Sequence, residues 1–185
     1  AWAPVNPTTK SILDIGSGSG ILALMLAQRC NANLIDGLEI DGEAYEQCAT
    51  NFESSPWADR LFCYHASLKA YTNEMDIKYD FIISNPPFYS ENFSTNDKLR
   101  NMARFEAEMP FNELLKSVRK LLSKNGRFCV IIPFKSEKKL VEIGKENTLF
   151  SDKILRIRGQ KNSIIKRSLL SFSFEKKPVE INEIY

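Results

Sequence analysis

Apolar runs alternate with amphipathic segments along most of this chain of 185 residues. Short apolar runs bounded by turn residues predict buried strands, whereas a one-sided apolar pattern predicts surface helices. Strands are expected near residues 11–15, 32–38, 61–65, 79–84, 127–132, 153–158 and 168–175. Helices are expected near residues 19–30, 42–53, 111–124 and 136–147.

The order of these elements predicts an α/β fold. Strands and helices alternate through the fifth strand, which favours a parallel, doubly wound sheet with helices on both faces. No helix is expected between the last two strands, so they should form an antiparallel hairpin. We therefore expect a seven-stranded, mostly parallel sheet in a single domain of residues 1–185.

A glycine-rich segment, Gly16-Ser17-Gly18-Ser19-Gly20, follows the first expected strand. Glycines between a strand and a helix let the backbone turn sharply and approach a ligand closely. Asp14 stands two residues before the first glycine. A carboxylate there would repel a pyrophosphate but would suit a ligand with an amino group.

Glu39 follows the second expected strand, 19 residues after Gly20. A carboxylate at this place can accept hydrogen bonds from both hydroxyls of a ribose. The plain alternative for Glu39 is a solvated acid at a strand end. Asp41 is expected to cap the helix that begins at Gly42, which requires no ligand.

The tetrad Asn85-Pro86-Pro87-Phe88 follows the fourth expected strand. Proline cannot donate to a sheet, so the strand must end at Ser84 or Asn85. An amide, two prolines and an aromatic ring at this position form a rigid surface that can hold a flat ring with an amide or amino group. A strand-terminating turn is the alternative for the tetrad alone.

The net charge of +2 is unevenly divided along the chain. Residues 1–92 hold 5 basic and 12 acidic residues, whereas residues 93–185 hold 20 basic and 11 acidic residues. This asymmetry predicts a polyanionic partner for the C-terminal half, although solvated helix faces account for many of the lysines. The candidate cations are Arg100, Arg104, Arg156, Arg158, Lys161, Lys166 and Arg167.

The sequence gives no reason to expect a metal site or a membrane span. Its four cysteines are widely spaced and it has one histidine, His65, whereas metal sites need clustered ligands. The cysteines are expected to be reduced thiols in or near the core, as in cytoplasmic proteins. No apolar run reaches 18 residues. A catalytic role for His65 is not favoured.

Together these segments resemble the Rossmann-like, class I S-adenosylmethionine methyltransferases. The tetrad is similar to that of the amino-methyltransferases, which modify exocyclic or amide nitrogens. The chain as a whole resembles the bacterial tRNA1(Val) adenine-N6 methyltransferase family, which modifies the adenine next to the anticodon. The segments that carry this resemblance are Ala1 to Pro4, Asp14 to Arg29, Asn51, Ser55 to Trp57, Ser84 to Tyr89 and Ala103-Arg104. Family members normally extend further at both ends, which implies a trimmed chain.

The resemblance implies S-adenosylmethionine as cofactor, with tRNA as partner of a cytoplasmic monomer. Asp14 and the glycines would contact the amino acid moiety of the cofactor, Glu39 would contact its ribose and Ile40 its adenine. The family often has an acid near Ser67, so the Ser67 hydroxyl or a backbone group would take that contact. The implied cofactor residues are Asp14, Gly16, Ser17, Gly18, Gly20, Glu39, Ile40, Ser67 and Asn85. The implied catalytic residues are Asn85, Pro86, Pro87 and Phe88.

Several other functions remain open at this point. A protein-glutamine N5-methyltransferase uses the same tetrad on a planar amide, and guanine-N2 methylation of rRNA and adenine methylation of DNA are related reactions. A nicotinamide oxidoreductase would need a third glycine at a different spacing. A non-catalytic RNA-binding module would not need the intact Asp14, Glu39 and Asn85.

Overall fold

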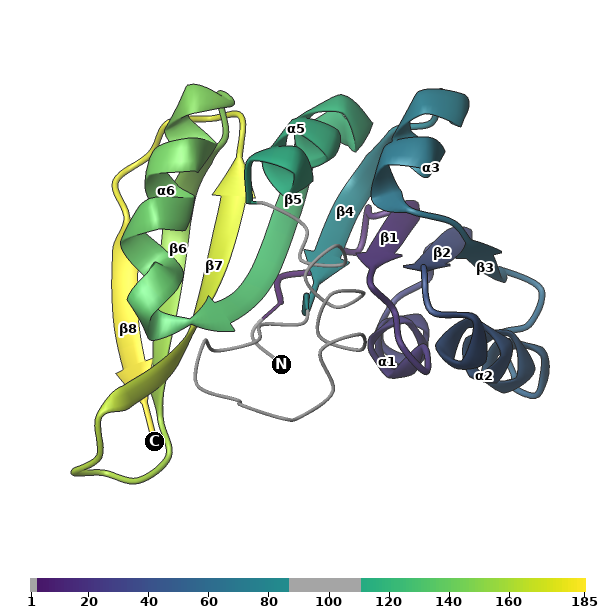
Figure 1. The fold of residues 1–185 in the computed structure, drawn as a ribbon, viewed down its shortest axis with the longest axis horizontal. Coiled ribbons are helices and arrows are strands. Elements are labelled where there is room, and N and C mark those ends of the chain that lie inside the picture. The colour runs from purple at the N-terminus through teal and green to yellow at the C-terminus, as the bar shows by residue number, and fades with distance from the viewer. Residues whose placement is uncertain (1–2, 87–110) are drawn as a thin grey trace, which may run out of the picture.

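The computed structural model describes residues 3–86 and 111–185. Eight strands form a single sheet in the order β3-β2-β1-β4-β5-β7-β6-β8 (Figure 1). The strands are β1 Ser11–Ile15, β2 Leu34–Glu39, β3 Leu61–His65, β4 Tyr79–Ser84, β5 Leu122–Pro133, β6 Phe150–Arg158, β7 Ile165–Ser173 and β8 Glu180–Ile184. The helices are α1 Ile21–Arg29, α2 Gly42–Glu53, α3 Leu68–Glu74, α5 Phe111–Leu121 and α6 Glu137–Glu146, and the 3-10 turn η1 is Phe134–Ser136.

Strands β1 to β5 are parallel, so their carboxyl ends meet at one edge of the sheet. Strand β7 pairs antiparallel with both β5 and β6, and β8 lies parallel to β6 at the outer edge. Because β6 runs in the same direction as β5, the turn between β6 and β7 lies at the edge where β4 and β5 end, the lower edge in Figure 1. We call this edge the active edge, because the candidate residues at the ends of β1, β2 and β4 lie there.

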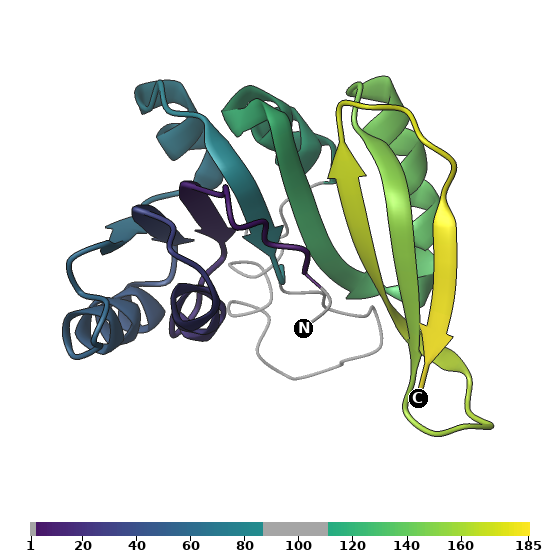
Figure 2. The ribbon, with the colours of Figure 1, turned by 180° about the vertical axis from the view of Figure 1, so that it is seen from behind.

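Helices cover the two faces of the sheet unequally. The apolar side chains of α3, α5 and α6 pack on one face in a core that includes Leu115, Val118 and Phe172. A second core that includes Phe52 lies under α1 and α2 on the other face. Seen from behind, α1 and α2 lie beside β1 to β3, and no described helix covers β6, β7 and β8 on that face (Figure 2).

The expected α/β fold class, with a mostly parallel sheet, helices on both faces and a C-terminal antiparallel pair, is confirmed. The expected number of seven strands is wrong, because β8 adds an eighth. All five of its residues are exposed, so it lacks the buried apolar face that identifies a strand in a sequence. The short helix α3 was also not expected. Its Ser67 accepts a hydrogen bond from the Ala70 N–H and so caps the helix start.

Asp36 is buried in the middle of β2, among the apolar side chains of the core. Its Oδ2 accepts hydrogen bonds from the hydroxyls of Tyr79 and Tyr71, and these hydroxyls lie 2.5 Å from each other. Burial raises the pKa of Asp36 to about 6, although the two tyrosine hydrogen bonds act in the opposite direction. A carboxylate in an otherwise apolar strand thus has specific partners on α3 and β4.

Candidate active site

The glycine-rich loop joins the end of β1 to the start of α1. Gly16, Gly18 and Gly20 have φ angles of 70°, 55° and 80°, which residues with a side chain rarely adopt. A Cβ on Gly20 would lie 2.5 Å from Cε1 of Phe52, so no larger residue fits without a shift. The Nδ2 of Asn51 donates to the Ser19 carbonyl over 2.9 Å. The loop is therefore held from α2 as well as by its own conformation.

One side chain of this loop, that of Ser17, packs into the core. Ser17 is buried, and its hydroxyl lies 3.6 Å from the sulfur of Cys48. Its side chain therefore faces the core, so Ser17 can contact a ligand only through its backbone.

All four cysteines, Cys30, Cys48, Cys63 and Cys129, are free thiols.

Asp14 lies at the end of β1 and is fully buried. Neither carboxylate oxygen has a hydrogen-bond partner among the described residues. Burial raises the pKa of Asp14 to about 7; the Ala23 N–H, which is near but not in the geometry of a hydrogen bond, lowers it, and the negative charge of Glu39 raises it further. An unpaired buried carboxylate is costly, so Asp14 is matched to a positively charged or hydrogen-bond-donating group that the described chain itself does not supply.

Glu39 ends β2 beside the glycine-rich loop. One oxygen accepts from the Gly18 N–H over 2.7 Å, and the other accepts from the Ile40 and Asp41 N–H groups over 2.8 and 2.9 Å. These three bonds fix the carboxylate at the active edge, and the one lone-pair site that remains, on Oε2, can accept from a hydroxyl. Next to it, Ile40 is 59% exposed, which is unusual for a large apolar side chain and suits a cover for a flat ring.

Ser67 and His65 follow in the next connection, at the end of β3. The Ser67 oxygen already accepts from the Ala70 N–H, so toward a ligand its hydroxyl is best used as a donor. The Nε2 of His65 lies 3.1 Å from the Ile40 carbonyl, and its ring stacks on Tyr45 with 5.1 Å between centroids. His65 therefore supports the segment after β2, a role that the sequence did not suggest.

Asn85 directly follows β4 and is exposed, whereas Pro86 is buried. The preceding Ser84 is also buried, and its hydroxyl donates to the Ile15 carbonyl over 2.9 Å. This bond joins the end of β4 to the end of β1, so the asparagine and the glycine-rich loop start from adjacent strands. Pro87 and Phe88 lie outside the described residues.

A cavity of about 190 Å³ lies beside Asn85. Its walls are mostly apolar and include Ile83, Ile131 and Leu169. A larger cavity of about 440 Å³ is lined by Lys116, Arg119 and Lys120, near the C-terminal ends of α5 and α6. That end of the sheet is opposite the active edge, so we associate the smaller cavity with the site.

The basic residues of β6 and β7 do not form one free patch. Nε and Nη2 of Arg156 donate to Glu137 over 3.2 and 2.8 Å. Arg158 donates to Glu183 and to the Ser163 carbonyl. Lys166 and Arg167 are exposed, and Lys161 lies 6.0 Å from the ring centroid of Tyr185. Arg100 and Arg104 lie outside the described residues.

Comparison with known proteins identifies the family. Residues 3–148 match the family model described as Methyltransferase small domain. The chain is 53% identical over 186 residues to the tRNA1(Val) (adenine(37)-N6)-methyltransferase of Christiangramia forsetii, covering 100% of this chain and 78% of that protein. It is 54% identical over 185 residues to the protein of the same name from Flavobacterium johnsoniae, covering 100% and 79%. The chain belongs to this methyltransferase family. It is an enzyme, and the resemblance given by its sequence motifs is confirmed.

Solved structures agree with the fold of a methyltransferase. A predicted O-methyltransferase from Agrobacterium tumefaciens superimposes with a TM-score of 0.74 at 15% identity, over 98% of this chain and 82% of that one. A TehB-like SAM-dependent methyltransferase from Corynebacterium glutamicum gives a TM-score of 0.63 at 15% identity, over 91% and 82%. At these identities the likeness is one of fold. No helix among the described residues is long and apolar enough to cross a membrane.

Proposed function

We propose that this methyltransferase transfers a methyl group from S-adenosylmethionine to N6 of an adenine in the anticodon loop of tRNA1(Val), in the cytoplasm. The observation that carries the proposal is the exposed Asn85 at the active edge, between the strand that leads to the glycine-rich loop and the apolar cavity. Relatives that are 53% and 54% identical carry the name of this reaction. The names do not favour a protein-glutamine or guanine-N2 methyltransferase.

The residues around the loop suit S-adenosylmethionine, which supplies an electrophilic methyl group on a positively charged sulfur when it is bound. The unpaired Asp14 matches the positive charge of its amino acid moiety, directly or through a backbone group. The glycines allow close approach, and the free lone-pair site of Glu39 accepts from a ribose hydroxyl. Ile40 covers the adenine, and the Ser67 hydroxyl faces its edge.

Asn85 and Pro86 prepare the nucleophile. An adenine amino group is a weak nucleophile because its lone pair is delocalised into the ring. If Oδ1 of Asn85 and the Pro86 carbonyl accept its two N–H bonds, the nitrogen becomes pyramidal and its lone pair points toward the methyl carbon. As the carbon–nitrogen bond forms, the bond from the methyl carbon to sulfur breaks and its electron pair stays on sulfur, which leaves as a neutral thioether. The methylated nitrogen then loses its extra proton to solvent, so no strong base is required. Catalysis then consists mainly of positioning and electrostatic stabilisation.

The other two tetrad residues and the basic residues complete the proposal. Phe88 stacks on the target base, which is worth about 1–3 kcal/mol, and Pro87 keeps the segment rigid. An unpaired base of a loop is easily turned out of the stack, which favours an anticodon loop over a duplex. Arg100, Arg104, Lys161, Lys166 and Arg167 are the candidates for contact with RNA phosphates.

The test is methyl transfer by the Asn85→Ala variant. We expect kcat to fall about 10²- to 10³-fold, as when a positioned hydrogen-bonding group is removed from an active site. The affinity for S-adenosylmethionine, measured by calorimetry, should stay within a few-fold of the wild type. Asn33→Ala, an exposed asparagine before β2 at the opposite end of the sheet, is the matched control and should be fully active. An Asn85→Ala enzyme with most of its activity would overturn the proposed role.

The substrate is tested by offering tRNA, rRNA fragments and a glutamine-containing release factor to the wild-type enzyme. Labelled methyl groups should appear as N6-methyladenine in the tRNA alone. Labelling of the protein, or of guanine in the rRNA, would replace the proposal by one of its rivals.

A further inference from the structure

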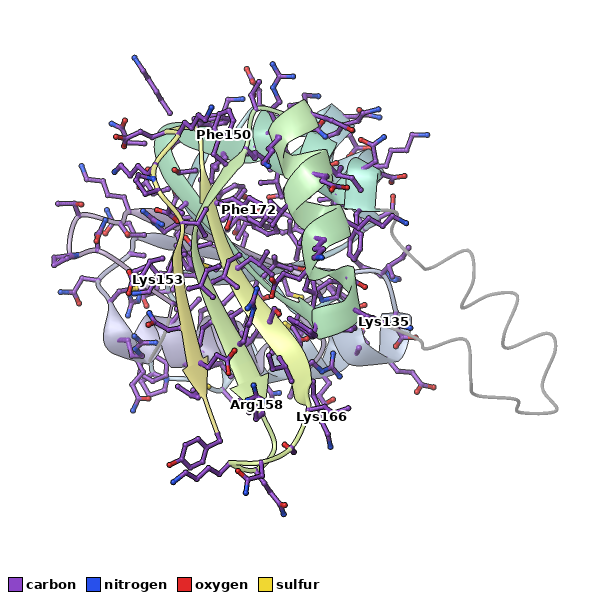
Figure 3. The ribbon with its side chains drawn as sticks, turned by 90° about the vertical axis from the view of Figure 1, so that its left-hand side faces the viewer. Lys135, Phe150, Lys153, Arg158, Lys166 and Phe172 are labelled. Atoms are coloured by element: carbon purple, nitrogen blue, oxygen red, sulfur yellow. The ribbon has the colours of Figure 1, made fainter. Side chains whose placement is uncertain are left out.

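The turn η1 brings one more lysine to the active edge, beside the β6–β7 pair. Lys135 is exposed in the middle of η1, and η1 packs against β7. Pro133, two residues before Lys135, faces Arg167 in the pairing of β5 with β7. Figure 3 shows Lys135 at the foot of α6, with Arg158 and Lys166 at the lower ends of β6 and β7. We call Lys135, Lys166 and Arg167 the basic rim.

Among the residues that the structure describes, no acid compensates the positive charge of the basic rim. Glu137, at the start of α6, and Glu183, on β8, already accept hydrogen bonds from Arg156 and Arg158. No described acid forms an ion pair with any residue of the rim, within residues 3–86 and 111–185. Exposed cations without acidic partners attract an anion from solution.

The rim also lies close to Asn85. Ser84 pairs with Val130 on β5, and Arg167 of the next strand pairs with Pro133, three positions further along. Two strand spacings and two to three residues of strand place Arg167 roughly 10 Å across and about 7–10 Å beyond Asn85 in backbone position. Long side chains shorten that gap, so the rim can reach the nucleotides next to a base held at Asn85.

A buried network holds the turn that carries Lys135. Glu137, which directly follows η1, accepts from Arg156 and, over 2.5 Å, from the Ser168 hydroxyl. Burial would raise the pKa of Glu137, but these hydrogen bonds and the positive charge of Arg156 outweigh it and keep the pKa below its usual value. The Arg156 guanidinium also lies 5.4 Å from the ring centroid of Phe134. On either side of Lys135–Ser136, Glu137 is thus joined to β6 and β7, and Phe134 is joined to β6.

We propose that the basic rim binds backbone phosphates of the RNA strand next to the target adenine, and that Lys135 is one of the contacts. In this arrangement Arg156 does not touch RNA. It is a positioning residue that holds Lys135 in place through Glu137 and Phe134. This inference rests on the proposed RNA substrate.

The experiment measures binding of an anticodon stem-loop RNA at several salt concentrations. The slope of log K against log salt is negative. For a single-stranded contact, each lost phosphate interaction reduces its magnitude by about 0.7. We expect this decrease for Lys135→Ala and for Lys166→Ala, with a raised KM for RNA and unchanged kcat, because these contacts hold substrate and transition state equally. The affinity for S-adenosylmethionine should not change in either variant.

Lys145→Ala is the matched control, because Lys145 is an exposed lysine at the other end of α6. Its salt slope should equal that of the wild type. Wild-type slopes in both rim variants would overturn the inference while leaving RNA methylation intact. A wild-type enzyme that neither binds nor methylates the RNA would instead overturn the proposed function.

The positioning role of Arg156 is tested by the double variant Glu137→Gln/Arg156→Gln, which removes both charges together so that neither is left unpaired. We expect it to lower the salt slope in the wild-type background but not in the Lys135→Ala background. Ser168→Ala, which removes one hydrogen bond to Glu137, should act in the same direction and more weakly. A further decrease in the Lys135→Ala background would show that Arg156 contacts RNA directly and would contradict its positioning role.

Discussion

The two sides of the active edge are organised in different ways. On the side of β1 and β2, the Glu39 carboxylate is held by backbone N–H groups, those of Gly18, Ile40 and Asp41. On the side of β6 and β7, the arginines are held by side chains of opposite charge. Arg156 reaches Glu137 across 19 positions, and Arg158 reaches Glu183 across 25.

This difference determines what each side can do without a ligand. The β1–β2 side keeps an unpaired buried carboxylate, Asp14, and so has a deficit that a ligand can satisfy. The β6–β7 side satisfies its buried acid internally and leaves only exposed cations free. The first side favours binding of a specific small molecule, whereas the second favours a polyanion with little chemical discrimination.

The largest expected effect concerns Asp14, whose buried carboxylate should lower the free energy of unfolding when it is ionised. The pKa of Asp14 in the folded protein is raised from 3.8 to about 7, so folding favours the protonated carboxyl group. The stabilising contribution of that protonated form is complete below about pH 4 and is lost as the pH rises through 7. Asp14→Asn should therefore match the wild type in stability near pH 4 and exceed it by on the order of 4 kcal/mol above pH 7. Urea unfolding at several pH values measures this difference. Asp59→Asn, at an exposed acid, should show no such trend, and identical profiles for the two variants would refute the argument.

The next largest effect is expected for Arg156, the cation that pairs with the buried Glu137. Arg156→Met leaves the buried Glu137 carboxylate without its cation, and we expect the free energy of unfolding to fall by about 3 kcal/mol, since the pair is largely buried. Arg167→Met, which removes an exposed arginine one strand away, should change it by less than about 0.5 kcal/mol. Equal effects in thermal and urea unfolding would mean that the two arginines do not differ as the structure indicates.

Gly18 and Gly20 of the loop should differ in the unfolding free energy that is lost when each is replaced by alanine. Both Gly18→Ala and Gly20→Ala force a residue with a Cβ into a positive φ, at 55° and 80°. Only at Gly20 would the new Cβ also overlap with neighbours, 2.5 Å from Cε1 of Phe52 and 2.8 Å from the Cys48 sulfur. We expect Gly20→Ala to cost about 2 kcal/mol more in unfolding free energy than Gly18→Ala, the typical cost of overpacking. A smaller loss at Gly20 would contradict the close packing of the loop on α2.

The smallest expected effect is on the affinity for S-adenosylmethionine. Glu39→Ala removes a charged hydrogen-bond acceptor from the ribose, and we expect the affinity to weaken by about 1.5 kcal/mol, roughly tenfold in Kd. Calorimetry is the measurement, and Glu46→Ala, an exposed acid further along α2, is the control. If Glu39→Ala binds the cofactor as tightly as Glu46→Ala, the ribose contact is made by another group.

The sequence predicted the segments of the site better than it predicted their surroundings. The glycine-rich loop and Asn85 each follow a short apolar strand, and Glu39 ends one. Local patterns of this kind place residues at strand ends with small error. The burial of the Ser17 side chain depends on Cys48, which lies on another element, so no local pattern contains it. The same holds for the support that His65 and Asn51 give to the site.

The basic residues show the limit of reasoning from charge clusters. Arg156 and Arg158 are close in sequence to Lys161, Lys166 and Arg167, which suggested one RNA-binding group. Whether an arginine is free depends on the acids that strand pairing brings near it, and the order β5-β7-β6-β8 was not predictable from the sequence. The exposed strand β8, which was not expected at all, supplies Glu183.

The buried carboxylate of Asp36 has a consequence for assembly of the site. If β2 paired with its neighbours one residue out of step, Asp36 would turn to the opposite face of the sheet, away from the two tyrosine hydroxyls and into the apolar core beneath α1 and α2. An unsolvated negative charge there would cost several kcal/mol, which penalises the misaligned chain during folding. Glu39 lies three residues later on the same strand. The buried Asp36 therefore also fixes the position at which Glu39, the proposed ribose-binding acid, reaches the active edge.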